Sequence, residues 1–149
     1  METIQFLSVP ENRTAVRAIS QQVLAEVAPA EISVSARFID PLIEMAPEGK
    51  VVADASDQAM GLAGGELMVL IVVPVVTTVL SKLLTKIGED SIEALKKRLK
   101  HDQKAKALIK VTVDDIEVVV SRSKSPISKK KVRELVRVLN AALLSYLAS

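Results

Sequence analysis

Cysteine and tryptophan are absent from this chain and histidine occurs once, which removes much of the side-chain chemistry that enzymes use. Without cysteine the chain forms neither a disulfide framework nor a thiolate metal site. The single histidine, His101, lies in a basic run that is typical of a solvated surface, and it has no second histidine or cysteine beside it for nucleophilic catalysis. We therefore predict that the protein is not an enzyme, with no catalytic residues, no metal and no cofactor.

Aromatic residues are scarce too, at 2% of the sequence, while hydrophobic residues make up 49%. The core must therefore be aliphatic, built from valine, leucine, isoleucine and alanine. At 149 residues the chain has the usual size of one domain, so we expect residues 1–149 to fold as a single unit. The acidic opening Met1-Glu2-Thr3 lacks the apolar stretch of a signal peptide, which favours a cytoplasmic protein, with membrane association as the alternative.

The net charge of +2 hides an uneven distribution along the chain. Residues 1–66 carry four basic and ten acidic side chains, whereas residues 67–149 carry sixteen basic and eight acidic ones. If the segment between the halves crossed a membrane, the basic side would face the cytoplasm. Otherwise the two halves would attract each other, within a subunit or between subunits.

Hydrophobic periodicity predicts an α+β fold in which amphipathic helices cover a small sheet. Apolar residues recur at helical spacing over 11–28 and over 92–99, and Ser125-Pro126 should open a last amphipathic helix. Alternation of apolar and polar residues predicts the strands, which lie at 3–7, 32–39, 108–113 and 116–121.

The last two predicted strands give the clearest hairpin signal. Apolar residues alternate on both sides of Asp114-Asp115, which would supply a two-residue turn. The apolar face of this hairpin would consist of Ile109, Val111, Val113, Ile116, Val118 and Val120. Paired carboxylates also perform acid–base catalysis or hold a hard cation, but the turn is the favoured interpretation here.

The most apolar part of the sequence is a predicted helix over 58–87, which Pro74 should kink. At ~1.5 Å of rise per residue, its most apolar stretch, 67–80, is too short for a hydrocarbon core of ~30 Å. Three locations stay open for this helix: the core of the subunit, an interface between subunits, or a bilayer. The bilayer version uses residues 67–87, with the ammonium group of Lys82 reaching back to the membrane surface.

A basic stretch follows the apolar helix and suggests contact with anions. Lysine and arginine dominate residues 96–106, which would meet phosphates or anionic lipid headgroups. Nucleic acid is the weaker partner, because no aromatic residue is interleaved for base stacking. From the helix and the basic stretch we predict these interaction residues: Leu67, Leu70, Ile71, Val75, Leu80, Lys96, Lys97, Arg98 and Lys100.

The order of these elements over residues 3–147 is similar to that of the effector-associated constant component family of bacterial conflict systems. The resemblance rests on the apolar helix, the closing helix and the hairpin between them. That hairpin reads Val111-Thr112-Val113, a turn, and Ile116-Glu117-Val118-Val119-Val120. The resemblance implies a non-enzymatic accessory protein coupled to separate effectors, such as proteases or nucleotide-driven switches, and it supplies no catalytic residues.

We therefore expect a non-catalytic interaction or adaptor protein of a bacterial defence or signalling system. It would bind a protein partner, or a second copy of itself as a homo-oligomer, through the apolar helix and the basic helices. The alternative is a membrane-acting protein, anchored or pore-forming, that inserts residues 67–87 and places 96–106 at an anionic membrane surface. An enzyme that uses only Asp114 and Asp115 is the least supported hypothesis.

Overall fold

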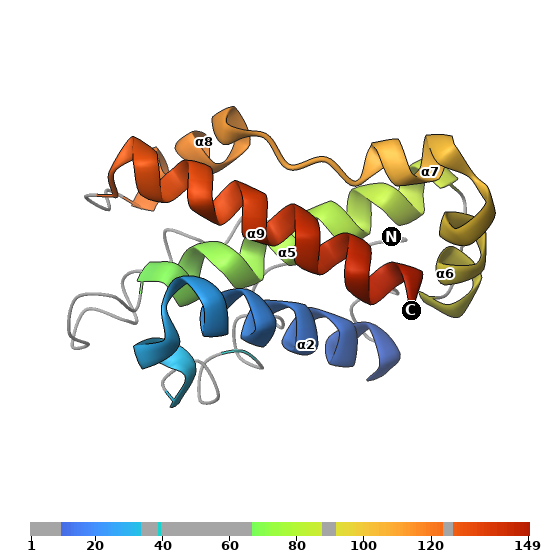
Figure 1. Cartoon of the computed structure of the whole chain (residues 1–149), viewed down its shortest axis with the longest axis horizontal. Helices are drawn as coiled ribbons and strands as arrows, with labels where there is room; N and C mark the ends of the chain where they lie inside the picture. Colours follow the sequence, from blue (N-terminus) through green and yellow to red (C-terminus); the bar gives the residue numbers. More distant parts are fainter. Residues whose placement is uncertain (1–9, 34–38, 40–66, 88–91, 124–126) are drawn as a thin grey trace.

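The structure is a computed structural model that describes residues 10–33, 39, 67–87, 92–123 and 127–149 (Figure 1). Regular secondary structure in these residues is entirely helical. The fold class of the described part is therefore all-α, and the predicted α+β fold is wrong.

The described part of the chain contains several α-helices and one 3₁₀ turn. They are α2 (Pro10–Val27), the 3₁₀ turn η1 (Pro29–Glu31), α5 (Leu67–Ile87), α6 (Ile92–His101), α7 (Gln103–Leu108), α8 (Val113–Ser123) and α9 (Lys129–Ala148).

The first of these helices, α2, confirms the amphipathic pattern in the sequence. Its buried residues recur every three or four positions, so they form one continuous stripe on the helix. The stripe consists of Ala15, Val16, Ile19, Val23, Leu24 and Val27. The helix ends where Pro29 follows, because a residue before proline avoids the helical conformation, and Ala28 indeed has φ −147° and ψ 68°.

The apolar helix α5 lies in the core of the subunit. Its side chains are buried on every side of the helix rather than along one stripe, with Pro74 inside the helix. The buried apolar set is Val69, Ile71, Val72, Val73, Val75, Val76, Leu80, Leu83 and Leu84. Because each fully buried valine, leucine or isoleucine contributes ~1.5–3 kcal/mol, this helix supplies a large part of the stability of the fold.

Three helices form the body of the molecule, and shorter helices close its two ends. The helices α2, α5 and α9 run along the long axis, with α9 in front of α5 in the view of Figure 1. Helix α2 packs against both α5 and α9. At one end α6 packs against α9, and at the other end α8 packs against both α9 and α5. The outward side of α9 is thereby left without a covering element among those described.

Several polar side chains are buried with the apolar core, namely Asn12, Ser20, Glu31, Thr77 and Ser81, and two of them are fully buried hydroxyl groups. The side chains of Ser20 on α2 and Thr77 on α5 are fully buried. Neither Ser20 Oγ nor Thr77 Oγ1 has a hydrogen-bond partner within the described part of the chain. Burying such a group without a partner costs about 1–3 kcal/mol, so the aliphatic side chains around it must offset this loss.

The hairpin predicted at 108–121 is replaced by the end of α7, an extended link and α8. Alternation in the link is real, because Ile109 and Val111 are buried while Lys110 and Thr112 are exposed. However, the backbone of Val111 is paired with the side chain of Asn140 on α9, not with a second strand. The alternating burial of residues 109–112 therefore belongs to an extended link and not to a strand of a sheet.

The predicted turn Asp114-Asp115 lies instead in the first turn of α8. The Thr112 backbone amide and hydroxyl donate to Asp115 Oδ2 at 3.0 and 2.7 Å, and the Asp115 amide is 3.2 Å from Thr112 Oγ1. These reciprocal bonds form a capping box, which satisfies donors that a helix start leaves unpaired. In the helix Val118 points away from the core and is 51% exposed, although the predicted hairpin required it to be buried.

The remaining predictions meet the structure only in part. The predicted strand at 3–7 and the part of the apolar helix at 58–66 lie outside the described residues. Within the predicted strand 32–39, the three described residues are helical. The last helix begins at Lys129 with Ser128 as its N-cap, not at Ser125-Pro126. The single domain over 1–149 stays a prediction.

The capping box of α8 gives a direct test of the helical structure at 113–123. Replacing Asp115→Ala removes the cap and should destabilise the protein by about 0.5–2 kcal/mol in thermal or urea unfolding. Asp114→Ala is the matched control, because it removes the same charge from the same helix turn without breaking the cap. Equal losses in the two variants would contradict the capping box.

Candidate interaction surface

Three of the five predicted apolar interaction residues lie in the core. The side chains of Ile71, Val75 and Leu80 belong to the hydrophobic core, with exposed fractions of 0%, 6% and 0%. Leu67 and Leu70 lie in α5, but their side chains are outside the described part. A partner that approaches the folded subunit cannot contact the three core residues, so an interaction surface must be sought elsewhere.

The predicted basic residues lie on α6, and Lys96 among them has a structural role. Its Nζ lies 4.7 Å from the centre of the Tyr146 ring on α9 and 3.6 Å from Glu93 Oε1. The first contact is a cation–π interaction, which contributes about 0.5–1 kcal/mol at an exposed site. Lys96 therefore links α6 to the end of α9. Because its ammonium group already contacts Tyr146 and Glu93, it is less available to a partner.

The other three basic residues of α6 are exposed. Arg98 Nη2 lies 3.9 Å from Asp102 Oδ2, and Asp102 Oδ1 accepts a hydrogen bond of 2.9 Å from the backbone amide of Lys104. Asp102 thus caps the start of α7 while it partly balances Arg98. Lys97 and Lys100 make no ion pair with a described residue, so these two present their charge outward.

The exposed side of α9 carries a second set of basic residues. We call it the outer stripe of α9, and it consists of Lys130, Arg133, Arg137, Ala141, Leu144 and Ala148. At 100° per residue these six positions fall within a narrow arc, opposite the buried arc of Val132, Leu135, Leu139, Ala142 and Leu143. All six side chains are exposed.

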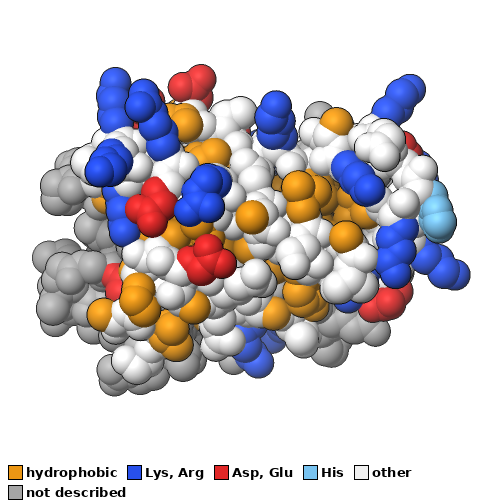
Figure 2. Space-filling model, in the orientation of Figure 1, with side chains coloured by type: hydrophobic (Ala, Val, Ile, Leu, Met, Phe, Trp, Pro, Cys, Tyr) orange, Lys and Arg blue, Asp and Glu red, His pale blue; other side chains and the backbone are white. Residues whose placement is uncertain are grey.

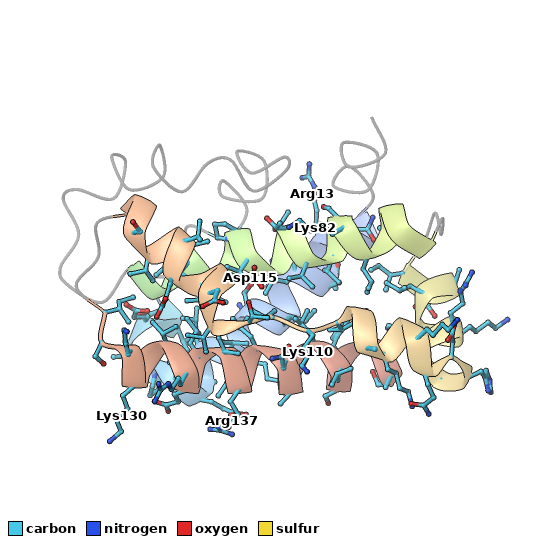
Figure 3. All side chains as sticks on the ribbon, turned by 90° about the horizontal axis from the view of Figure 1, so that it is seen from above. Arg13, Lys82, Lys110, Asp115, Lys130 and Arg137 are labelled. Carbon is cyan, nitrogen blue, oxygen red and sulfur yellow. The ribbon has the colours of Figure 1, made fainter. Side chains whose placement is uncertain are left out.

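Two figures show how this surface is arranged. On the face that carries α9, lysine and arginine gather toward both ends, and hydrophobic side chains lie between them (Figure 2). Lys130 and Arg137 project away from α9, on the opposite side of the molecule from Arg13 and Lys82 (Figure 3). The outer stripe therefore runs from a basic half to an apolar half and approaches the basic end formed by α6.

Specific contacts hold α9 in this orientation. Lys131 Nζ donates a hydrogen bond of 2.8 Å to the backbone oxygen of Val27 at the end of α2, and it lies 3.9 Å from Glu134 Oε2. A cation at the carboxyl end of a helix is favourable, because the last carbonyl groups there are unpaired. Lys131 thereby points away from the outer stripe and fixes the rotation of α9 against α2.

Asn140 fixes the opposite flank of α9. Its Oδ1 accepts a hydrogen bond of 2.8 Å from the Val111 amide, and its Nδ2 donates one of 3.0 Å to the Val111 oxygen. The side chain thus pairs with a peptide unit as a neighbouring strand would. This contact holds the link 109–112 along one flank of α9, and the side chain of Lys110 in that link is exposed.

The described residues offer few groups for catalysis or metal binding. No group of three acidic, histidine or cysteine side chains in the described ranges is arranged to hold a metal ion. His101 is exposed at the end of α6, and Asp114 and Asp115 lie at the start of α8. Among the helices described, none combines the length and apolar character needed to cross a membrane.

Comparisons with other proteins identify no relative. The chain matches no protein-family model, and neither a curated protein nor a solved structure is significantly similar to it. The resemblance to the effector-associated constant component family therefore stays a prediction. Its hairpin element corresponds to α7, the link and α8 in the structure.

The basic residues of α9 were not among the interaction residues predicted from the sequence. Their spacing was the available signal, because Lys130, Arg133 and Arg137 lie three and four positions apart on a helix whose apolar face is complete. The pairing of Asn140 with Val111 left no comparable signal, since a single asparagine in a helix does not reveal a contact 29 residues away.

The Asn140 contact generates a prediction about the flank of the outer stripe. Asn140→Ala removes both bonds to Val111 and should destabilise the protein by about 1–3 kcal/mol in urea unfolding. Ser145→Ala, at an exposed position of the same helix, should change stability by less than about 0.5 kcal/mol. Unchanged stability in Asn140→Ala would show that the link 109–112 is held by something else.

Proposed function

We propose that this protein is a non-catalytic interaction or adaptor protein that binds a protein partner through the exposed basic surface of α6 and α9. The observation that carries the proposal is the concentration, on these two helices, of exposed cations that make no ion pair in the described structure. They are Lys97, Lys100, Lys129, Lys130, Arg133 and Arg137.

The charge balance of these helices supports a binding role. Residues 92–108 contain six basic and two acidic side chains, and residues 129–148 contain five basic and one acidic, although the whole chain carries only +2. Like charges three or four positions apart destabilise a helix by about 0.2–0.5 kcal/mol per pair. A partner with acidic side chains would relieve this repulsion and would associate faster through electrostatic attraction.

The partner is expected to contact the exposed surface of the subunit, not the side chains of α5. Because Ile71, Val75 and Leu80 lie in the core, we propose that the partner, or a second copy of the chain, contacts the polar surface. A place in a bacterial defence or signalling system is part of the proposal, and its support is the sequence resemblance alone. The burial of the α5 side chains in the core of the subunit does not favour insertion of 67–87 into a bilayer.

Site-specific photo-crosslinking in the native host tests this proposal. A benzophenone amino acid would replace Lys97 or Lys100 on α6, and a control chain would carry it at Lys82, an exposed position of α5 (Figure 3). We expect a discrete protein adduct from positions 97 and 100 that is absent from position 82. An adduct of twice the chain mass of 16.1 kDa would identify self-association.

The control also defines the negative result. Adducts of equal yield from 97, 100 and 82 would reflect random collisions rather than a binding surface. If no adduct formed at either α6 position, while light scattering showed a strict monomer, the interaction role would be rejected.

A further inference from the structure

We infer that the outer stripe of α9 is a docking site for an acidic amphipathic helix of a partner protein. This inference rests on the proposed interaction role and names the partner's chemistry. The stripe presents three cations followed by small or apolar side chains, and Lys110 adds a fourth cation at its flank. The complementary surface has carboxylates at one end and apolar side chains at the other.

The dimensions of the stripe fit a helix. From Lys130 to Ala148 the axis of α9 rises by about 27 Å at ~1.5 Å per residue, which equals the length of a helix of about eighteen residues. Helices pack with their axes about 8–10 Å apart, at the short end where the contacting side chains are small. Ala141 and Ala148 are exposed and small, so a second helix can approach α9 closely beside Leu144.

The start of α9 has a charge arrangement that costs stability. Its first turn contains Lys129, Lys130 and Lys131 and no acidic residue. The amino end of a helix already carries a partial positive charge, so cations there are unfavourable and anions favourable. Lys131 compensates through its bond to Val27, but Lys130 points outward without an ion pair among the described residues. A carboxylate on a docked helix would stabilise this end.

An acidic helix fits the stripe better than a membrane or a nucleic acid does. An interfacial helix inserts its apolar face among lipid chains, but α9 uses that face in the core and exposes only Leu144 of its large apolar residues, at 37%. A nucleic acid would use the cations alone and would leave the apolar half of the stripe without contacts. Only a partner with both carboxylates and apolar side chains uses the whole surface.

The probe for this site is a synthetic helical peptide of eighteen residues, about the length of the stripe. One face of the peptide helix is designed to contact the outer stripe. That face carries glutamate in one half of the peptide and leucine and alanine in the other half. Its binding to the full chain is measured by fluorescence anisotropy. The matched peptide has glutamine in place of every glutamate, which keeps the apolar side chains and removes the charge.

Two charge-reversal variants locate the binding site. Arg137→Glu, in the middle of the stripe, should weaken binding of the glutamate peptide by about tenfold or more, because a close charge pair becomes a repulsion. Lys82→Glu changes the chain by the same charge on the opposite side of the molecule, and it should weaken binding by less than about twofold. The glutamine peptide should bind more weakly than the glutamate peptide to the unmodified chain.

A third variant separates binding from stability. Lys130→Glu places an anion at the amino end of α9, so it should raise the melting temperature by about 1–4 °C. The same variant should weaken binding of the glutamate peptide by about tenfold. Loss of binding in a more stable protein cannot be attributed to unfolding.

The outcomes distinguish this inference from the proposed function. Equal effects of Arg137→Glu and Lys82→Glu, or equal affinity for the two peptides, would overturn the acidic-helix site. Binding of phosphatidylserine vesicles or duplex DNA that depends on Arg137, without binding of the peptide, would also overturn it. If crosslinks still formed at positions 97 and 100, the interaction role would stand and only the acidic helix would be rejected.

Discussion

Burial of the α5 side chains is the constraint on which the rest of the structure depends. A helix that is apolar on every side has to be enclosed, and α2 and α8 pack directly against it while α9 packs across α2 and α5. The apolar faces of the amphipathic helices are therefore buried in enclosing α5. The hydroxyl groups of Ser20 and Thr77 are buried without hydrogen-bond partners in the described part, so the core includes groups whose burial costs free energy. In the described part, the large apolar side chains that remain exposed are Ile32, Val118 and Leu144.

The enclosed core therefore determines where an interaction can occur. The apolar arc of α9 is buried in the core. The outer stripe lies on the opposite side of the helix, so its residues are exposed. Lys131 and Asn140 fix the rotation of that helix on its two flanks, through Val27 and Val111. The basic side chains are thus carried by a rigid element, as a binding surface requires.

Sequence patterns predicted the helices well where a single period was sustained over several turns. The buried face of α6, with Ile92, Leu95 and Leu99, follows the apolar spacing over 92–99, and the last helix is amphipathic as the sequence predicted. The prediction at 108–121 was wrong because valine-rich alternation over a few residues does not distinguish a strand from a short helix. The spacing of Thr112 and Asp115 was a capping signal that should have outweighed the alternation.

The candidate site could be predicted only in part. The basic stretch that contains Lys97 and Lys100 can be recognised in the sequence, and both residues were predicted as interaction residues. By contrast, sequence alone could not decide whether Ile71, Val75 and Leu80 formed a core or an interface, because both need the same apolar residues. The choice depends on how much area the other helices supply, which is a property of the assembled fold.

Amide hydrogen exchange of α5 in the full chain, followed over a wide range of protein concentration, tests the central claim most directly. If α5 is the core of one subunit, the amides of residues 69–84 should exchange only through global unfolding, at rates that do not change on dilution. Faster exchange of these amides in dilute solution, while those of α9 stay protected, would show that a second subunit covers α5 and would contradict the account.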